Sequence, residues 1–470
     1  MNNKFYITTA IPYVNAKPHV GHALEFVQAD VIARYHKLLN EDVILLSGSD
    51  ENALKNVQAA EIAGKDIKTF VDENSVLFEN LAQKLNVHFD IFQKGSSKNH
   101  FDSSQELWKL CEQNEDIYKK DYTGFYCIGC ELFYEKEELN ENGECFEHPG
   151  KPLERVSESN YFFRLSNYQD VLKKLIETDE LKIIPTTRKN EMLSFLEQGL
   201  KDISISRSNE RAKNWGVPVP GDDSQRMYVW FDALNIYRSG LGEKYDKFWP
   251  ADVHVIGKGI TRFHAIYWPA FLLSAKLPLP KSLFIHGYFT VDGQKMSKTL
   301  GNVIDPIDLI NKYGSDALRY YFLSQIPPTS DGDFSEEKLK TAYNADLANG
   351  IGNLVARVAK LAEKVSLIFS TEQTAKFSNE INVYLKEYRF NDALFNIWGR
   401  IKILDQEINQ DEPWKIADEN NLKEKLWNYS LAIRNVAFDL QPFLPETAEK
   451  ILNQFSGEIR SGESLFPRVT

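Results

Sequence analysis

The first hydrophobic patterns of the chain predict a strand, a helix and a second strand. Residues 4–10 alternate between apolar and polar positions as a strand does, and residues 42–46 form a second strand-like run. Between them, residues 22–39 carry apolar side chains with helical periodicity, after a loop that contains prolines. Strand, helix and strand form a βαβ unit, which predicts a parallel sheet with ligands at the carboxyl ends of its strands.

The strand pattern returns later in the chain, so the sheet is predicted to be interrupted by an insertion. Two short apolar runs, 253–256 and 283–285, flank an aromatic helical stretch at 261–274. The insertion, at 108–225, contains clustered cysteines, an acidic hairpin-like stretch and amphipathic helical runs. Residues 342–455 show long helical periodicity and almost no strand pattern, which predicts a separate helical bundle.

Composition excludes several classes of protein. A chain of 470 residues is too long for one core, and its 43% apolar and 26% charged residues are typical of globular domains rather than fibres or disorder. No run approaches the roughly 18 apolar residues that cross a bilayer. The first residues lead directly into a strand, so no cleaved signal is predicted and a cytoplasmic location is expected.

The formal charge of −12 weighs against nucleic acid binding by the chain as a whole, because phosphate binding depends on lysine and arginine. An RNA-binding function would need local basic patches. The candidates are Arg207, Arg211 and Lys213, and further on Arg357, Lys360 and Lys364. Scattered basic residues are also common on solvated surfaces, so charge alone leaves this open.

The first loop-to-helix junction carries the run His19-Val20-Gly21-His22. Imidazole N–H groups at a helix N-terminus suit phosphate oxygens, because the helix dipole and the backbone donors already favour an anion there. The glycine leaves room for a flat base. Taken alone, the run is explained equally well by helix capping and packing.

A second run, Lys295-Met296-Ser297-Lys298-Thr299, follows an Asp292-Gly293 pair that predicts a tight hairpin turn. Lysines on a loop can reach a triphosphate and neutralise the charge that builds in a transition state. Taken alone, such a run is more often an exposed basic loop.

The two runs together resemble the H-I-G-H and K-M-S-K-S signatures of class I aminoacyl-tRNA synthetases, in the same order and on two halves of a split nucleotide-binding fold. The resemblance implies attack of a carboxylate on the ATP α-phosphate, with Mg²⁺ accompanying ATP. It implies catalytic roles for His19, His22, Lys295 and Lys298, and ATP binding by His19, Gly21, His22 and Lys298. Thr299 replaces the last serine of the signature and keeps a hydroxyl.

Longer runs resemble methionyl-tRNA synthetases over nearly the whole chain. They are T-A-I-P-Y at 9–13, Y-V-W-F-D-A at 228–233, I-G-K at 256–258, R-F-H at 262–264 and W-P-A at 268–270. By position, the resemblance implies a methionine pocket formed by Ala10, Ile11, Tyr13, Trp230, Ala233, Tyr237, Ile260 and His264. A polarizable thioether favours an aromatic and apolar cage, at about 0.3 to 1.5 kcal/mol per sulfur–ring contact. Any one of these aromatic residues is also explained as core packing.

Asp50, at the end of the second predicted strand, matches the family carboxylate that receives the substrate ammonium group, a charge-assisted pairing. The sequence departs from the resembled family at two places. The usual D-E-H-G run reads Asp50-Glu51-Asn52-Ala53, and the usual G-K-D run reads Gly257-Lys258-Gly259. These departures leave open how the ATP ribose is bound.

The clustered cysteines form the pattern C-x₂-C-x₁₄-C-x₂-H through Cys127, Cys130, Cys145 and His148. Two x₂ pairs can place four ligands tetrahedrally around one zinc ion, and four protein ligands close the site. One structural zinc per chain is therefore predicted, and the resembled family carries a similar zinc knuckle in its insertion. The alternative is buried cysteines without metal. Cys111 lies outside the pattern and is predicted to be a core residue.

The helical region resembles the anticodon-binding domain of the family. Asn353 and Arg357 fit its N-x₃-R pattern and share one helix face, and Pro413-Trp414 supplies an indole that can stack on an unpaired base. The resemblance implies anticodon binding by Asn353, Arg357 and Trp414. On composition alone, Trp414 is better explained as a packing residue. The implied partners are L-methionine, ATP, tRNA(Met) and initiator tRNA, with no membrane.

The predicted fold is α/β: a split parallel-sheet, Rossmann-like catalytic domain with a zinc-knuckle insertion, followed by an all-α anticodon-binding domain. The predicted boundaries are 1–107 and 226–288 for the two catalytic halves, 108–225 for the insertion, 289–341 for a stem-contact region with the lysine loop, and 342–470 for the helical domain. The chain stops soon after that domain, so a monomer is expected.

Two alternatives remain beside this reading. A class I synthetase for leucine, isoleucine, valine or cysteine is one, but the insertion at 108–225 leaves no room for the editing domain of the branched-chain enzymes. A tRNA-binding homologue without catalysis predicts damage in the histidine or lysine run, and both runs are intact. A small H-x-G-H nucleotidyltransferase would not carry the helical domain.

Overall fold

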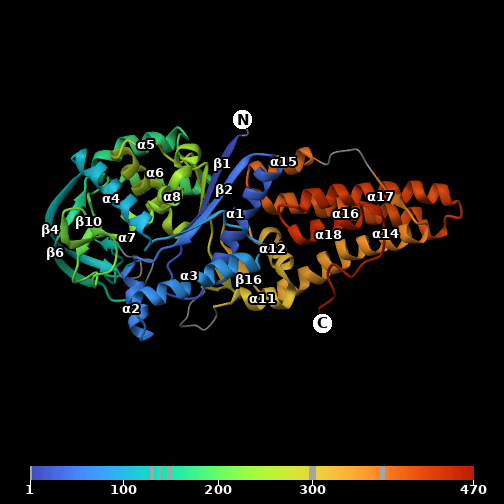
Figure 1. The fold of residues 1–470 in the computed structure, drawn as a ribbon, viewed down its shortest axis with the longest axis horizontal. Helices are drawn as coiled ribbons and strands as arrows, with labels where there is room; N and C mark the ends of the chain where they lie inside the picture. The colour runs from blue at the N-terminus through green and yellow to red at the C-terminus, as the bar shows by residue number, and fades with distance from the viewer. Residues whose placement is uncertain are drawn as a thin grey trace. The chain divides into compact units, whose positions relative to one another are not determined.

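The computed structural model describes residues 3–127, 132–134, 136, 139–145, 150–295, 303–370 and 376–469. They fall into two compact units (Figure 1). The sheet unit comprises residues 1–18, 40–80 and 88–286, and the helical unit comprises residues 19–39, 81–87 and 287–470. Among the helices of the described segments, none combines the length and hydropathy that a membrane crossing needs.

A six-stranded parallel sheet forms the centre of the sheet unit, with the strand order β3-β2-β1-β12-β13-β7. Its strands are β1 (Lys4–Thr9), β2 (Asp42–Ser49), β3 (Ile91–Lys94), β7 (Lys182–Ile184), β12 (Val253–Gly257) and β13 (Ser282–His286). The four strands predicted from sequence are confirmed, and so is their assembly into one interrupted sheet. The burial of β2 fits a sheet whose two faces are both covered, since all of its residues but the first are buried.

The edge strand β7 departs from the prediction, because it lies inside the segment assigned to the insertion. Its residues pair with β13 through Ser282 and Lys182, Leu283 and Ile183, and Phe284 and Ile184. A three-residue strand is too short to show a hydrophobic period, and therefore the sequence pattern gives no sign of it. The insertion is thus joined to the central sheet by backbone hydrogen bonds.

The insertion also contains an antiparallel sheet that the sequence pattern does not reveal. Its long strands, β4 (Ile117–Cys127) and β6 (Glu154–Phe163), pair from Ile117 and Phe163 to Tyr126 and Glu154, with β5 (Leu132–Tyr134) and β8 (Ile203–Ser204) beside them. Most of β4 is exposed or half-buried, so it lacks the apolar alternation that marks a strand. A smaller sheet consists of β9 (Ser206–Ser208), β10 (Pro218–Val219) and β11 (Asp222–Met227).

Helices complete the sheet unit and include those predicted from periodicity. The aromatic stretch at 261–274 is helical, with a π-helical segment, η5 (Phe263–Tyr267), that continues into α10 (Trp268–Ser274). The others are α2 (Leu54–Ile62), α4 (Lys98–Gln113), α5 (Gln169–Glu177), α6 (Thr186–Glu197), α7 (Val229–Ala233), α8 (Ile236–Ser239), α9 (Tyr245–Phe248) and, shared with the helical unit, α3 (Ile67–Lys84).

The helical unit contains the predicted bundle and, in addition, the first long helix of the chain, α1 (Val20–Leu38). Figure 1 shows α14, α16, α17 and α18 lying side by side. The helices are α11 (Pro306–Tyr313), α12 (Ser315–Ser324), α13 (Glu336–Ala342), the π-helical η6 (Tyr343–Gly352), α14 (Asn353–Lys364), α15 (Asn379–Lys386), α16 (Phe390–Asp411), α17 (Glu419–Leu440) and α18 (Pro445–Gln454). Short strands are β14 (Phe289–Val291), β15 (Gln294–Lys295), β16 (Gly332–Phe334), β17 (Ile368–Phe369) and β18 (Gly457–Glu458).

A buried arginine joins α1 to the rest of the helical unit. Arg319 of α12 is fully buried, and its guanidinium Nη2 lies 2.7 Å from Oδ2 of Asp30 on α1. The same guanidinium donates to three backbone carbonyls: 2.7 Å to Phe443, 3.1 Å to Leu85 and 2.9 Å to Pro442. Each of the three guanidinium nitrogens therefore has an acceptor, which a buried charge requires.

We expect Arg319→Met to destabilise the helical unit by about 3–5 kcal/mol, because the buried Asp30 carboxylate would keep only Arg34 as a partner and three backbone carbonyls would lose their donor. Adding Asp30→Leu should recover only part of this loss, since the three carbonyls still lack donors. Hydrogen exchange measured by mass spectrometry on peptides of α1 and α12 reports this local opening. Arg389→Ala, which removes exposed ion pairs with Glu387 and Asp392, is the control and should exchange like wild type. Equal exchange in all variants would contradict the role of Arg319.

Candidate functional site

The loops after β1 and β2 meet at the carboxyl edge of the sheet, because the two strands are parallel neighbours and end at the same edge. Asp50 directly follows β2, its backbone N–H donates to the carbonyl of Pro12 at 2.9 Å, and it forms a parallel bridge with Tyr13. Asp50 is only 3% exposed. The sequence prediction that places Asp50 at the end of the second strand is therefore confirmed, and so is its closeness to the 9–13 run.

The three carbonyls of the Asp50–Asn52 loop all accept hydrogen bonds from side chains, two of which come from the insertion. Nδ2 of Asn56 donates to the Asp50 carbonyl at 2.8 Å, and Nε1 of Trp215 donates to the Glu51 carbonyl at 2.7 Å. Nη2 of Arg207 donates to the Asn52 carbonyl at 3.0 Å. A loop whose every carbonyl is fixed in this way holds the carboxylate of Asp50 in a defined place.

This finding corrects one of the two candidate basic patches. Arg207 is 3% exposed and bonded to the Asn52 carbonyl, so it is not part of a surface that could meet phosphates. Its neighbours are also engaged: Nη2 of Arg211 lies 2.8 Å from Oε2 of Glu154, and Lys213 pairs with Glu61. Sequence counts basic residues but does not show their burial, which is why it offered Arg207 as a candidate.

Aromatic side chains form the apolar part of the same region. Trp230, on α7, stacks on Phe263 with ring centroids 3.7 Å apart and planes 4° from parallel. Tyr13 meets the same indole edge to face at 6.2 Å. Trp230 is 7% exposed, so its ring is surrounded by other side chains rather than by solvent. An uncharged, polarizable group would find favourable contacts against these rings.

A tyrosine and two histidines form the polar part of this cluster. Nδ1 of His264 lies 2.9 Å from the Ile260 carbonyl, which can only accept, so Nδ1 carries the proton. Nε2 of His264, 2.7 Å from the Tyr237 hydroxyl, therefore accepts from it. The Tyr237 ring also packs on His254 at 4.4 Å, and His254 bonds Thr8 through Nδ1 at 2.6 Å.

Burial keeps both imidazoles neutral. It lowers the pKa of His264 from the ordinary value of 6.5 to about 4, although the hydrogen bond to the Ile260 carbonyl opposes this shift. Burial, and secondarily the nearby His264, lower the pKa of His254 well below its ordinary value. The cluster therefore presents no positive charge near neutral pH, which suits a neutral ligand.

Several of the residues expected from sequence around methionine are in direct contact, Tyr13 with Trp230 and both Trp230 and Tyr237 with His264. Ala10, Trp230, Ala233 and Tyr237 belong to one buried cluster, and Ile11, Tyr13 and Ile260 pack against it. His264 joins through Tyr237, and Asp50 through its bridge to Tyr13. Methionine binding by these residues stays a prediction. The residues to which sequence reasoning gave no role are Asn52, His100, Asp232, His254 and Phe263; Asn52 was recorded as a departure from a family run, Asp232 and Phe263 lie inside two of the family runs, and His100 and His254 lie in none of them.

In the helical unit, His19 and His22 cap the helix whose start they occupy. The backbone N–H of Gly21 donates to Nδ1 of His19 at 3.1 Å, and the backbone N–H of His19 donates to Nδ1 of His22 at 3.2 Å. The rings lie 3.9 Å apart. Because both Nδ1 atoms accept, the proton of each neutral ring sits on Nε2. A Cβ on Gly21 would lie 2.9 Å from the His19 ring, so glycine permits this arrangement.

The lysine run begins at the predicted hairpin. β14 and β15 pair through Val291 and Gln294, with positive φ angles of 49° at Asp292 and 75° at Gly293, as a tight two-residue turn requires. The turn is held by Asp333, whose Oδ1 accepts from the Gly293 N–H at 2.7 Å. That bond, with others from Thr290 and Lys338, lowers the pKa of Asp333 to about 2. The backbone of Lys295 lies in β15, whereas Lys298 is outside the described residues.

A family model described as tRNA synthetases class I (M) matches residues 5–359. The chain is 41% identical to the methionine–tRNA ligase of Thermotoga maritima, over 97% of this chain and 76% of that protein. It is 40% identical to the methionine–tRNA ligase of Brucella suis, over 96% of this chain and 91% of that protein.

The chain belongs to the methionine–tRNA ligase family.

Solved structures of this family share the fold. The Mycobacterium tuberculosis methionyl-tRNA synthetase in complex with methionyl-adenylate gives a TM-score of 0.91 at 35% identity, covering 99% of this chain and 100% of that chain. The free-state structure of the same enzyme gives a TM-score of 0.83 at 32% identity, covering 100% and 99%. The predicted family, the α/β fold with its helical C-terminal region and the enzyme class are therefore confirmed.

Two of the four predicted zinc ligands, Cys127 and Cys145, are among the residues that the structure describes. Cys127, at the end of β4, and Cys145 are both buried. Sγ of Cys145 lies 3.3 Å from the hydroxyl of Tyr134 on β5, so Cys145 sits against the β4–β5 hairpin that ends at Cys127. Cys130 and His148 are outside the described residues. No group of three potential metal ligands occurs among the residues that are described, which leaves the zinc prediction untested.

Cys111 is a core residue, as predicted. It is fully buried, its thiol donates to the Phe271 carbonyl at 3.6 Å, and burial raises its pKa to about 12. A thiol with so high a pKa is inert near neutral pH.

The three residues expected at the anticodon lie at the surface of the helical unit. Arg357, on α14, pairs with Asp405 at 2.6 Å and donates to Asn409 at 2.8 Å, both in the last turns of α16. Trp414 follows the end of α16 and is 50% exposed, and Asn353 is exposed one turn before Arg357. An indole this exposed is not a core packing residue. Contact with an anticodon stays a prediction.

The depressed pKa of His264 gives a pH dependence of stability with a definite sign. In the unfolded chain this imidazole takes up a proton as the pH falls below 6.5, whereas in the folded protein it does so only near pH 4. Its contribution to the free energy of unfolding is therefore complete above pH 6.5 and is lost progressively between pH 6.5 and pH 4.

We expect His264→Gln to be less stable than wild type at pH 7, with a difference that shrinks by about 1.4 kcal/mol per pH unit across this window. Urea unfolding of both proteins at several pH values measures the difference. Parallel stability curves for the two proteins would show that His264 is not buried as a neutral group.

Proposed function

We propose that this chain activates L-methionine with ATP and transfers the methionyl group from the adenylate to the 3′ end of its tRNA. The observation that carries the proposal is the Asp50 carboxylate, buried and fixed by its loop, beside an uncharged cluster that contains Trp230 and Tyr237. Relatives named methionine–tRNA ligase and a solved relative that holds methionyl-adenylate support it.

Two groups of methionine can be recognised by this site, the ammonium group and the thioether. Its ammonium group pairs with the Asp50 carboxylate in a charge-assisted contact. Its thioether is polarizable and uncharged, and it packs against Tyr13 and Trp230, with the neutral His264 and the Tyr237 hydroxyl as the polar end of the pocket. Ala10, Ile11, Ala233 and Ile260 complete the apolar lining. A charged side chain would have no partner there, so the site discriminates by solvation as well as by shape.

ATP binding is assigned to the start of α1 and to the lysine loop. The Nε2–H groups of His19 and His22 are suited to donate to phosphate oxygens, with Gly21 between the two rings. Lys295 and Lys298 neutralise the charge that develops as pyrophosphate leaves. Mg²⁺ accompanies ATP and shields its phosphate charges. The Gly257-Lys258-Gly259 departure puts no carboxylate at that point of the chain, so the ribose is bound without one there.

The zinc proposal rests on the chemistry of the donor set. Cys127 and Cys145 are buried thiols at one hairpin, and Cys130 and His148 complete the metal-ligand spacing in the sequence. A zinc ion bound there would hold this part of the insertion together. It would have no role in the chemical step, because four protein ligands leave no open position.

The partner tRNA is recognised by the helical unit in this proposal. Asn353, Arg357 and Trp414 offer an amide, a guanidinium and an exposed indole to unpaired anticodon bases of tRNA(Met) and initiator tRNA. The domain limits follow the sequence: 1–107 and 226–288 catalytic, 108–225 insertion, 289–341 stem contact and 342–470 anticodon binding. The enzyme works as a monomer in the cytoplasm.

Pyrophosphate exchange with ATP, run with each amino acid in turn, tests the activity directly. We expect exchange with L-methionine alone, because only its side chain fits the neutral aromatic pocket and its ammonium group pairs with Asp50. Asp50→Asn keeps the shape but removes the charge, and should raise the KM for methionine about tenfold or more. Exchange with leucine, isoleucine, valine or cysteine in place of methionine would support another class I synthetase instead.

Trp414→Ala separates tRNA recognition from amino-acid activation. Stacking of a base on an aromatic side chain is worth roughly 1–3 kcal/mol, so kcat/KM for tRNA should fall by about one to two orders of magnitude. Methionine-dependent pyrophosphate exchange needs no anticodon and should stay near wild type. Phe395→Ala, at an 83% exposed aromatic residue of the same unit, is the matched control and should change neither activity. A parallel loss of both activities with a lower melting temperature would make Trp414 a packing residue.

A further inference from the structure

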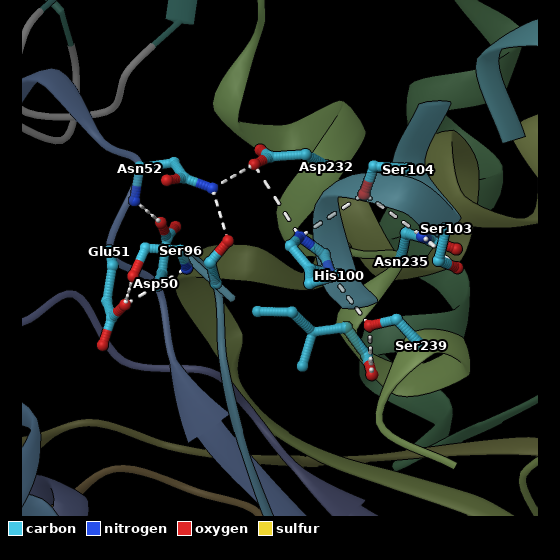
Figure 2. Close-up of polar contacts among 12 residues, drawn as sticks. Asp50, Glu51, Asn52, Ser96, His100, Ser103, Ser104, Asp232, Asn235 and Ser239 are labelled. Carbon is cyan, nitrogen blue, oxygen red and sulfur yellow. Dashed lines mark hydrogen bonds and ion pairs between the residues drawn. The ribbon is translucent and has the colours of Figure 1, made fainter. Parts of the chain in front are cut away.

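One asparagine links the two ends of the proposed methionine site. Figure 2 shows the side chain of Asn52 directed toward Asp232, while its backbone nitrogen faces the Asp50 carboxylate. Nδ2 of Asn52 donates to Oδ2 of Asp232 at 2.6 Å and to the Gly95 carbonyl at 2.9 Å. The backbone N–H of Asn52 donates to Oδ1 of Asp50 at 3.2 Å.

The orientation of this amide is dictated by its partners. A carboxylate and a carbonyl can only accept, so the group that faces them must be the NH₂ end, which has two hydrogens for two acceptors. Asn52 is 3% exposed, and its backbone carbonyl is held by Arg207. The residue is thus fixed at its N–H, its carbonyl and its side chain at once.

Asp232 also lies close to a buried histidine, His100. Oδ2 of Asp232 lies 3.8 Å from Nε2 of the fully buried His100, whose Nδ1 lies 2.8 Å from the Ser239 hydroxyl (Figure 2). Asp232 is 1% exposed and stands on α7, two residues after Trp230 and one before Ala233. A bond from Asn52 to Asp232 therefore connects the Asp50 loop to the short helix that carries the aromatic wall of the pocket.

We propose that Asn52 is a positioning residue that sets the Asp50 carboxylate for the methionine ammonium group by tying the Asp50 loop to Asp232. The proposal rests on the function proposed above for Asp50. Asn52 touches no substrate: its backbone N–H fixes one oxygen of the Asp50 carboxylate, and its side chain fixes that N–H. Without the amide, the loop keeps its backbone bonds but loses its only side-chain link to α7 among the contacts shown in Figure 2.

The test compares ligands that contain or lack the ammonium group. Isothermal titration of the full chain measures the Kd of L-methionine, of L-methioninol, which keeps the ammonium group, and of 4-(methylthio)butanoate, which lacks it. For Asn52→Ala we expect the Kd of the first two to rise about 10- to 100-fold, as the loss of a hydrogen bond to a buried charge implies. The Kd of 4-(methylthio)butanoate should stay at its wild-type value, and so should the KM for ATP in pyrophosphate exchange.

Asp232→Ala should give the same ligand pattern, and the double variant should be no worse than either single one, because both remove the same link. Asn160→Ala is the matched control: Asn160 is an equally buried asparagine in β6 of the insertion, whose side chain donates to Glu158 at 3.3 Å. This variant should bind all three ligands as wild type does. If Asn52→Ala does not fold, Asn52→Ser, which keeps one donor, is measured in its place.

Three results would overturn the proposal in distinguishable ways. Equal loss of affinity for all three ligands, with a lower melting temperature, would mean that Asn52 only supports the fold. Unchanged affinity for L-methionine and L-methioninol would mean that Asp50 needs no such link. A wild-type protein that does not bind L-methionine would overturn the proposed function itself, and the inference with it.

Discussion

The fixed loop at the end of β2 is the constraint on which the rest of the site depends. A buried carboxylate such as that of Asp50, which is 3% exposed, stays in a defined place only if the backbone around it is satisfied and fixed. At Asp50 this is achieved by three carbonyls in a row that each accept a side-chain donor, from Asn56, Trp215 and Arg207. Two of these donors come from the insertion, and β7 of the insertion pairs with the central sheet. The insertion is therefore part of the site's framework.

The two units divide the proposed chemistry between them. The Asp50 loop and the aromatic cluster belong to the sheet unit, whereas His19 and His22 begin a helix of the helical unit. The Arg319–Asp30 pair explains that membership, because it joins α1 to α12 through a fully buried charge that has an acceptor at each guanidinium nitrogen.

Sequence patterns predicted the local and periodic parts of this structure. The four predicted strands of the central sheet are alternating or apolar runs, and apolar side chains recur every three or four residues along the bundle helices, so both leave a signal in a short window. The β4–β6 sheet left none, because β4 is largely exposed and carries lysines where a core strand would carry apolar residues. β7 is too short for any period.

Some residues of the candidate site could be identified from sequence motifs, whereas the contacts between them could not. Motif resemblance identified Trp230, Tyr237 and His264, which do lie together, whereas counting basic residues offered Arg207 as a candidate for a surface patch, and the structure buries it. The contacts of Asn52 with Asp232, and of Asp232 with His100, join segments far apart in sequence and follow from tertiary packing alone. The sequence showed Asn52 only as a departure from a family run. It gave no sign that the side chain of Asn52 bonds to Asp232.

A crystal structure of the protein with bound L-methionine tests the central claim most directly. The account predicts an ammonium nitrogen within about 3 Å of a carboxylate oxygen of Asp50 and a thioether against the rings of Tyr13 and Trp230. The Asp50–Asn52 loop should keep its hydrogen bonds to Asn56, Trp215 and Arg207. Methionine bound with its ammonium group away from Asp50, or a loop rebuilt on binding, would contradict the account.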